Sequence, residues 1–289
     1  MNKLNFVFWG TPKVASETLE ILKQAGFLPS MIITSPDAKS GRGLHLQASP
    51  VTVFAEKNNI PCLKPEKLNE EFSKQLSAKS YQLFIVVAYG KIIGEDILNM
   101  PKLGSINIHY SLLPKYRGAS PVESAILNGD PETGVTIQKM KFKIDSGSII
   151  AVEKVKIFPD EKAPDLRKRL IKVGGELLVK ILPEFVNGKI KGIEQNENEA
   201  TFCKKIKKED GLINLSDDPI KNYNKFRAYA TWPRTFFFQN GKRIIITEAM
   251  LENNPLDEAR GKQFIIKKVL PEGKKEIKYE DFTKTNIST

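Results

Sequence analysis

The stretch Leu83-Phe84-Ile85-Val86-Val87-Ala88 decides the fold, because it contains six apolar residues without a polar interruption. A strand with one face in water alternates apolar and polar residues, whereas a parallel strand covered on both faces reads as a continuous apolar run. Residues 4–9 and 31–34 are shorter runs of the same kind. The three stretches predict strands of a parallel sheet.

Helix-like segments alternate with these runs. Residues 14–25 carry apolar side chains at helical spacing and end at Gly26. Further helices are predicted at 121–128 and 162–186, the latter disturbed at Gly174-Gly175, and further strands at 105–109, 135–140 and 148–155. Alternation of this type predicts an α/β fold, a Rossmann-like and mostly parallel sheet with helices on both faces. Ligands of such sheets bind at the carboxyl ends of the strands.

The pattern changes after residue 186. Residues 187–203 are polar and charged, as expected of a linker. In the stretch 236–246, Asn240-Gly241 separates two β-prone runs, which predicts a hairpin with a type I′ turn. We therefore expect a catalytic domain at 1–186, the linker at 187–203 and a small β-rich domain at 204–289.

The charge of the chain points to an anionic partner. The formal net charge is +11. Residues 201–289 contribute 18 Lys and Arg against 12 Asp and Glu, a net of +6, whereas residues 1–200 contribute only +5. A basic C-terminal third is typical of a surface that contacts a phosphate backbone. The alternative is a lysine-rich solvated surface that binds nothing.

The number of cysteines and histidines and the hydropathy of the chain argue against several classes of protein. The two cysteines and two histidines are scattered along the chain, which argues against a disulfide framework and a zinc site, so we expect no metal. No apolar run approaches the roughly 18 residues that a membrane span needs, and the start lacks a signal peptide. We expect a cytoplasmic protein with no membrane partner.

Three polar residues are the candidates for chemistry. Asn107 and His109 are two apart in a predicted strand and so point to the same face. An amide donor beside an imidazole can stabilise the negative charge that a carbonyl oxygen gains when a nucleophile attacks its carbon. Asp145 follows a later strand, in a turn from which a carboxylate could orient the imidazole and relay a proton from an amine.

These residues resemble the active site of the folate-dependent formyltransferase family. Asn107 to His109 are followed by a Ser-Leu-Leu-Pro stretch and then by Arg117-Gly118. The resemblance implies that Asn107, His109 and Asp145 are catalytic and that 10-formyltetrahydrofolate is the co-substrate. It also implies that the folate site includes Ser111, Leu112, Leu113 and Pro114 and, on the weaker evidence of a buried strand end, Val87, Ala88, Tyr89 and Gly90.

Two further stretches resemble the members of this family that act on methionyl-tRNA. Residues 35–51 are similar to their insertion loop, whose arginine, here Arg42, engages the tRNA. Residues 226–233 are similar to an Arg-Ala-x-x-x-Trp-Pro element that opens a small oligonucleotide-binding-like (OB-like) barrel. The resemblance implies formylation of the α-amino group of methionyl initiator tRNA, which gives N-formylmethionyl-tRNA for translation initiation. We expect a monomer that also contacts tRNA through Lys204, Lys205, Lys207 and Lys208.

The sequence departs from the family pattern at three places. Tyr110 stands where a small residue is usual, which would reshape the rim of the folate pocket. Residues 140–144 lack the usual acidic and glycine positions before Asp145. The chain between Trp232-Pro233 and Gly273 is shorter by roughly a hairpin, which would leave the barrel incomplete.

Two alternatives remain open at this point. One is a formyltransferase of the same fold that acts on a small amine such as a sugar nucleotide, against which the Arg42 loop and the basic second domain argue. The other is a non-catalytic RNA-binding protein on the same scaffold, against which the three polar residues argue. An acceptor assay with charged initiator tRNA and amino sugar nucleotides separates them.

Overall fold

The computed structural model describes residues 4–40, 45–253 and 261–287. The chain forms two compact units. The first contains residues 1–117, 134–155 and 169–202, and the second contains residues 118–133, 156–168 and 203–289. Within the described residues, no helix has both the length and the apolar content to cross a bilayer.

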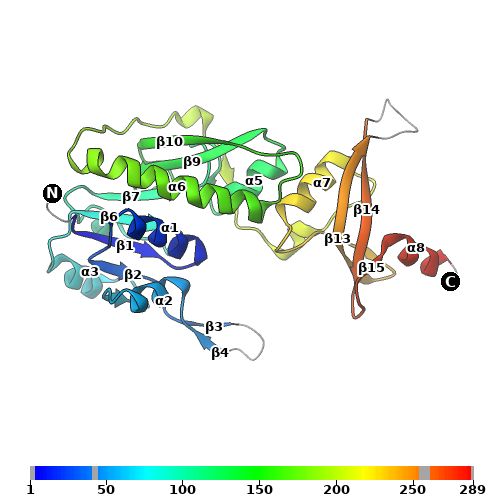
Figure 1. Cartoon of the computed structure of the whole chain (residues 1–289), viewed down its shortest axis with the longest axis horizontal. Helices are drawn as coiled ribbons and strands as arrows, with labels where there is room; N and C mark the ends of the chain where they lie inside the picture. Colours follow the sequence, from blue (N-terminus) through cyan, green and yellow to red (C-terminus); the bar gives the residue numbers. More distant parts are fainter. Residues whose placement is uncertain (1–3, 41–44, 254–260, 288–289) are drawn as a thin grey trace. The chain divides into compact units, whose positions relative to one another are not determined.

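A seven-stranded sheet is the centre of the first unit, in the order β10-β9-β7-β6-β1-β2-β5 (Figure 1). The sheet is parallel from β5 through β2, β1 and β6 to β7, and β9 pairs with β7 in the antiparallel direction. The predicted mostly parallel sheet is confirmed. The strands are β1 (Phe6–Gly10), β2 (Met31–Ile33), β5 (Cys62–Leu63), β6 (Leu83–Val87), β7 (Ser105–His109), β9 (Glu132–Lys139) and β10 (Ile149–Lys156).

Helices and two short pairs of strands complete this part of the chain. The helices are α1 (Lys13–Gln24), α2 (Pro50–Lys57), α3 (Glu70–Ser77), α4 (Glu95–Leu98) and α6 (Ala163–Val186), with a 3-10 turn η1 (Glu197–Glu199). The short strands are β3 (Ala38–Ser40) with β4 (His45–Gln47), and β8 (Arg117–Gly118) with β11 (Phe202–Cys203).

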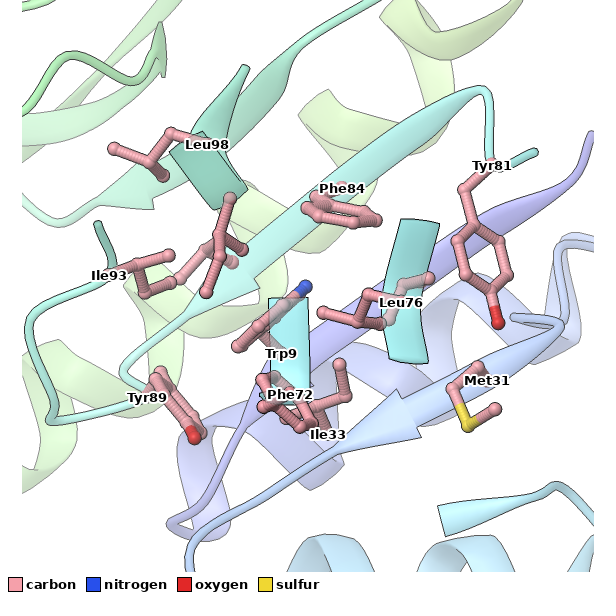
Figure 2. Close-up of a cluster of buried hydrophobic side chains, with 13 residues drawn as sticks. Trp9, Met31, Ile33, Phe72, Leu76, Tyr81, Phe84, Tyr89, Ile93 and Leu98 are labelled. Carbon is pink, nitrogen blue, oxygen red and sulfur yellow. The ribbon is translucent and has the colours of Figure 1, made fainter. Parts of the chain in front are cut away.

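One face of the sheet is sealed by an aromatic cluster around Trp9 (Figure 2). The Trp9 side chain is fully buried, and its ring centroid lies 6.2 Å from that of Phe72, 5.5 Å from that of Phe84 and 5.2 Å from that of Tyr89. Phe72 comes from α3, so the cluster joins this helix to the strands. It accounts for the alternate apolar residues of the first strands that point to this face.

Helix α6 runs without interruption through Gly174-Gly175, so the predicted disturbance is wrong. A Cβ atom at Gly174 would lie 3.1 Å from the side chains of Ile108 and Val135, and one at Gly175 would lie 2.6 Å from the side chain of Ile21. The two glycines therefore let the helix approach the sheet and α1 closely. Packing compensates for the low helix propensity of glycine.

The second unit is built on a four-stranded antiparallel sheet in the order β12-β13-β14-β15. Asn240 and Gly241 both have positive φ, 51° and 72°, which confirms the type I′ turn between β12 and β13. The strands are β12 (Phe236–Gln239), β13 (Lys242–Asn253), β14 (Lys262–Pro271) and β15 (Ile277–Lys278), and the helical segments are α5 (Pro121–Leu127), η2 (Lys208–Gly211), α7 (Pro219–Ala228) and α8 (Tyr279–Ile287).

We expect Trp9→Ala to destabilise the first unit by about 3–5 kcal/mol, because a large ring is removed from a close-packed core. The matched control is Trp232→Ala. The side chain of Trp232 is 55% exposed, and its loss should cost less than about 0.5 kcal/mol. Urea denaturation followed by circular dichroism measures both. Equal shifts of the two midpoints would contradict the assignment of the core.

Candidate active site

The tip of β7 carries the two polar residues that the sequence singles out. Asn107 lies opposite Gln138 of β9, and His109 lies opposite Thr136. Directly opposite residues of neighbouring strands project to the same face. The sheet therefore places four polar side chains together on one face, where β7 and β9 pair.

Both ring nitrogens of His109 face oxygen atoms, and Nε2 is hydrogen-bonded. The side chain is 6% exposed, Nε2 lies 2.8 Å from the carbonyl oxygen of Tyr116, and Nδ1 lies 3.5 Å from Oδ2 of Asp145. A carbonyl oxygen only accepts, so Nε2 carries the hydrogen in this bond. The ring is thereby oriented with Nδ1 towards the carboxylate.

Asp145 occupies a tight turn between β9 and β10. Its φ of 48° lies in the left-handed region, where aspartate is among the few side chains that are tolerated. The carboxylate is almost buried, with 15% of the side chain exposed. Its Oδ1 accepts a hydrogen bond of 2.8 Å from Nε2 of Gln138. The two carboxylate oxygens thus face different partners, Gln138 and His109.

Asn107 is half-buried on β7. None of the residues that the structure describes hydrogen-bonds to its side-chain amide. An amide donor close to the imidazole is therefore available for a substrate oxygen. Beside a His109 ring that carries a hydrogen on Nδ1 as well as on Nε2, this amide could stabilise an oxyanion.

The Ser-Leu-Leu-Pro bend is anchored on β9 by one threonine. Oγ1 of Thr136 donates to the carbonyl oxygen of Ser111 at 2.7 Å and accepts from the backbone N–H of Leu113 at 3.1 Å. The Ser111 hydroxyl donates to the carbonyl oxygen of Lys115 at 2.6 Å. The bend is closed on itself and held next to His109. Thr136 thus holds the segment that contains the predicted folate residues Ser111, Leu112, Leu113 and Pro114.

At the end of β6, the side chains of the other predicted folate residues differ in exposure. Val87 is fully buried, and Tyr89 lies in the Trp9 cluster with 3% of its surface exposed. Burial raises the pKa of the Tyr89 hydroxyl to about 12. Ala88 and Gly90 are exposed and have positive φ, 47° and 85°. Of these four residues, Ala88 and Gly90 are therefore the ones that present surface to a ligand.

Two of the departures from the family pattern have a structural explanation. The Tyr110 ring lies against α6, since a Cβ atom at Gly174 would be 3.5 Å from its Cε1. Ile108 contacts the same glycine, so Tyr110 points to the face of the strand away from His109. Lys141 and Lys143 form exposed ion pairs with Glu194 and Glu197, at 2.8 Å and 2.7 Å.

The predicted tRNA contacts lie in two other parts of the chain, at Arg42 and at residues 204–208. Arg42 lies outside the described residues. The side chains of the four lysines at the start of the second unit are exposed; these are Lys204, Lys205, Lys207 and Lys208.

The sequence reasoning missed three residues that hold this site. Gln138 and Thr136 could have been found, because polar residues at alternate positions of an otherwise apolar strand indicate a polar face. Gln195 carries no such signal, since it lies in the stretch predicted as a linker. Its Nε2 donates to the carbonyl oxygens of Asp145 and Gly147, at 2.9 Å and 2.7 Å.

Comparison with known proteins identifies the family of the chain. A family model described as formyl transferase matches residues 2–182, and one described as the C-terminal domain of formyl transferase matches residues 205–261. Among solved structures, the chain is similar to an N-formyltransferase from Helicobacter canadensis, solved with folinic acid and dTDP-3-aminofucose. The TM-score is 0.67 and the identity 22%, over 88% of this chain and 90% of that one. Methionyl-tRNA formyltransferase from Clostridium thermocellum gives a TM-score of 0.60 at 16% identity, over 95% and 99%. At such identities these two likenesses show the fold.

Curated relatives are much closer in sequence. The methionyl-tRNA formyltransferase of Thermotoga neapolitana is 40% identical over 256 residues, which are 88% of this chain and 82% of that protein. The enzyme of the same name from Buchnera aphidicola is 39% identical over 252 residues, 87% of this chain and 80% of that protein. The chain therefore belongs to the formyl transferase family and, within it, to the methionyl-tRNA formyltransferases.

Proposed function

We propose that this chain transfers the formyl group of 10-formyltetrahydrofolate to the α-amino group of methionyl initiator tRNA, which gives N-formylmethionyl-tRNA for translation initiation. The observation that carries the proposal is the approach of Asp145 to His109 at the tip of β7, where Oδ2 lies 3.5 Å from Nδ1. The family match and the curated relatives support the same reaction. We further propose that it acts in the cytoplasm as a monomer.

The reaction is an acyl transfer in which one C–N bond replaces another. The neutral amine of the methionyl group attacks the formyl carbon, and the carbonyl oxygen becomes an oxyanion. When the tetrahedral intermediate collapses, the bond between the formyl carbon and N10 breaks. One proton leaves the amine and one is gained by N10, so the proton balance closes without an external acid.

Each polar residue of the site has one part in this sequence. The Asn107 amide donates to the oxyanion, and His109 in its doubly protonated form stabilises it through the N–H at Nδ1, the nitrogen that is not held by Tyr116. The separation of 3.5 Å between Nδ1 and Asp145 exceeds an ordinary N–H···O bond, so a substrate atom can share this nitrogen. Asp145 accepts the proton of the attacking amine and passes it on.

The folate is held by the bend at residues 111–114 and by the exposed backbone after β6. Ala88 and Gly90 expose their backbone at the carboxyl edge of the sheet, where ligands of parallel sheets bind. The Ser111 and Leu113 anchors on Thr136 place the bend beside His109.

The acceptor is tRNA rather than a small amine. The basic charge of residues 201–289 and the exposed lysines at 204–208 suit a phosphate backbone. The likeness to a sugar formyltransferase concerns the fold, whereas identities near 40% link the chain to the tRNA enzymes.

Asn107→Ala and Asp145→Ala should each lower kcat roughly a hundredfold to a thousandfold, because each removes a group that acts on the transition state. The proteins should remain folded by circular dichroism. Asp217→Ala, an exposed aspartate of the second unit, is the control and should keep the wild-type rate. A kcat within threefold of wild type in either variant would remove that residue from the mechanism.

Replacement of Lys204 and Lys205 by alanine should raise KM for methionyl-tRNA and leave KM for 10-formyltetrahydrofolate unchanged. Each phosphate contact that is lost should lower the slope of log affinity against log salt by about 0.7–0.9. The control is Lys172→Ala, on exposed α6 surface of the first unit. An unchanged salt slope would show that these lysines do not bind the phosphate backbone.

A further inference from the structure

A buried glutamine holds the carboxylate of Asp145. Gln138 is 1% exposed. Its Nε2 donates to Oδ1 of Asp145 at 2.8 Å, and its Oε1 accepts the backbone N–H of Gly147 at 3.2 Å. A buried amide of this kind is oriented by its partners, so one of its two N–H groups is directed at Asp145.

We propose that Gln138 is a positioning residue for formyl transfer, which acts through Asp145 by directing Oδ2 of the carboxylate towards His109. The proposal rests on the proposed role of Asp145 as the group that accepts the proton of the amine. Gln138 itself touches no reacting atom.

The two oxygens of a carboxylate exchange places when the group rotates about its terminal bond. The hydrogen bond from Gln138 occupies Oδ1 and leaves Oδ2 at 3.5 Å from Nδ1 of His109. Loss of this donor removes one restraint on that rotation, and terminal torsions of this type have broad wells. The rate would fall because the productive orientation is occupied for less of the time.

A second glutamine also holds the backbone of the same turn. Gln195 donates from Nε2 to the carbonyl oxygens of Asp145 and Gly147, and its Oε1 accepts from Nε and Nη2 of Arg117 at 3.0 Å and 2.8 Å. Arg117 is fully buried and pairs with Glu197 at 2.8 Å. The bonds from Gln195 to Asp145 and Gly147, together with the bond from Gly147 to Gln138, therefore fix where the turn lies, while the bond from Nε2 of Gln138 to Oδ1 sets how the carboxylate is rotated.

The turn is pressed directly onto the end of β9. A Cβ atom at Gly147 would lie 1.5 Å from the carbonyl oxygen of Lys139, so only glycine allows this approach. Gln138 precedes Lys139 and lies opposite Asn107. Its side chain is thus one strand away from the catalytic amide and within reach of the catalytic carboxylate.

Gln138→Met and Gln138→Glu test the proposal. The first preserves the length of the side chain without the donor, and the second is isosteric and, when ionised, has only acceptors. Both should lower kcat roughly tenfold to a hundredfold, with KM for both substrates within twofold of wild type. The decisive measurement is kcat of the double variants that combine each Gln138 substitution with Asp145→Ala. In that background, either substitution should lower kcat no further, since residues that act as a unit are not additive.

Thr136→Val is the matched control, a buried polar-to-apolar change on the same face of β9. It removes the anchor of the folate bend, so KM for 10-formyltetrahydrofolate should rise while kcat is affected less.

A wild-type kcat in either Gln138 variant, or an additive loss with Asp145→Ala, would overturn the proposal. If Gln138→Met does not fold, Gln138→Glu decides alone. If Asp145→Ala keeps its activity, the catalytic role of Asp145 fails instead.

Discussion

The antiparallel pairing of β9 with β7 is the constraint on which the site depends. It sets Gln138 opposite Asn107 and Thr136 opposite His109. A shift of one residue in this register would turn all of β9 to the other face. Thr136 would then lose the folate bend and Gln138 would lose Asp145. The site is therefore specified by strand pairing, and the loops are fastened to it.

Much of the fold could be predicted from the sequence because its signals are local. Continuous apolar runs identified the strands of the parallel sheet, and Asn240-Gly241 identified a turn whose residues both have positive φ. The interpretation of Gly174-Gly175 failed for the opposite reason. Helix α6 approaches Ile108, Val135 and Ile21, which are distant in sequence, so this packing has no local signal. Here tertiary packing overrides helix propensity.

The candidate site was predictable only in part. Asn107 and His109 follow from strand periodicity, and Asp145 from its turn and from the family resemblance. Gln195 was not predictable, because a glutamine in a polar stretch has no periodic signal. Its importance comes from Arg117, which is 78 residues away in sequence and donates to it from a fully buried position. A buried guanidinium must be satisfied by acceptors, but sequence does not say which.

The departures from the family pattern are compensated by local changes. A large residue at position 110 is accommodated because Gly174 leaves space on α6. Lys143 replaces an acidic or glycine position, yet it pairs with Glu197, the same carboxylate that partners Arg117. Hydrogen bonds from Arg117 and Lys143 lower the pKa of Glu197 to about 2, so this carboxylate stays charged at any pH where the enzyme would work. The substituted turn before Asp145 is thereby tied through Glu197 to Arg117 and, through Arg117, to Gln195, which holds the backbone of Asp145.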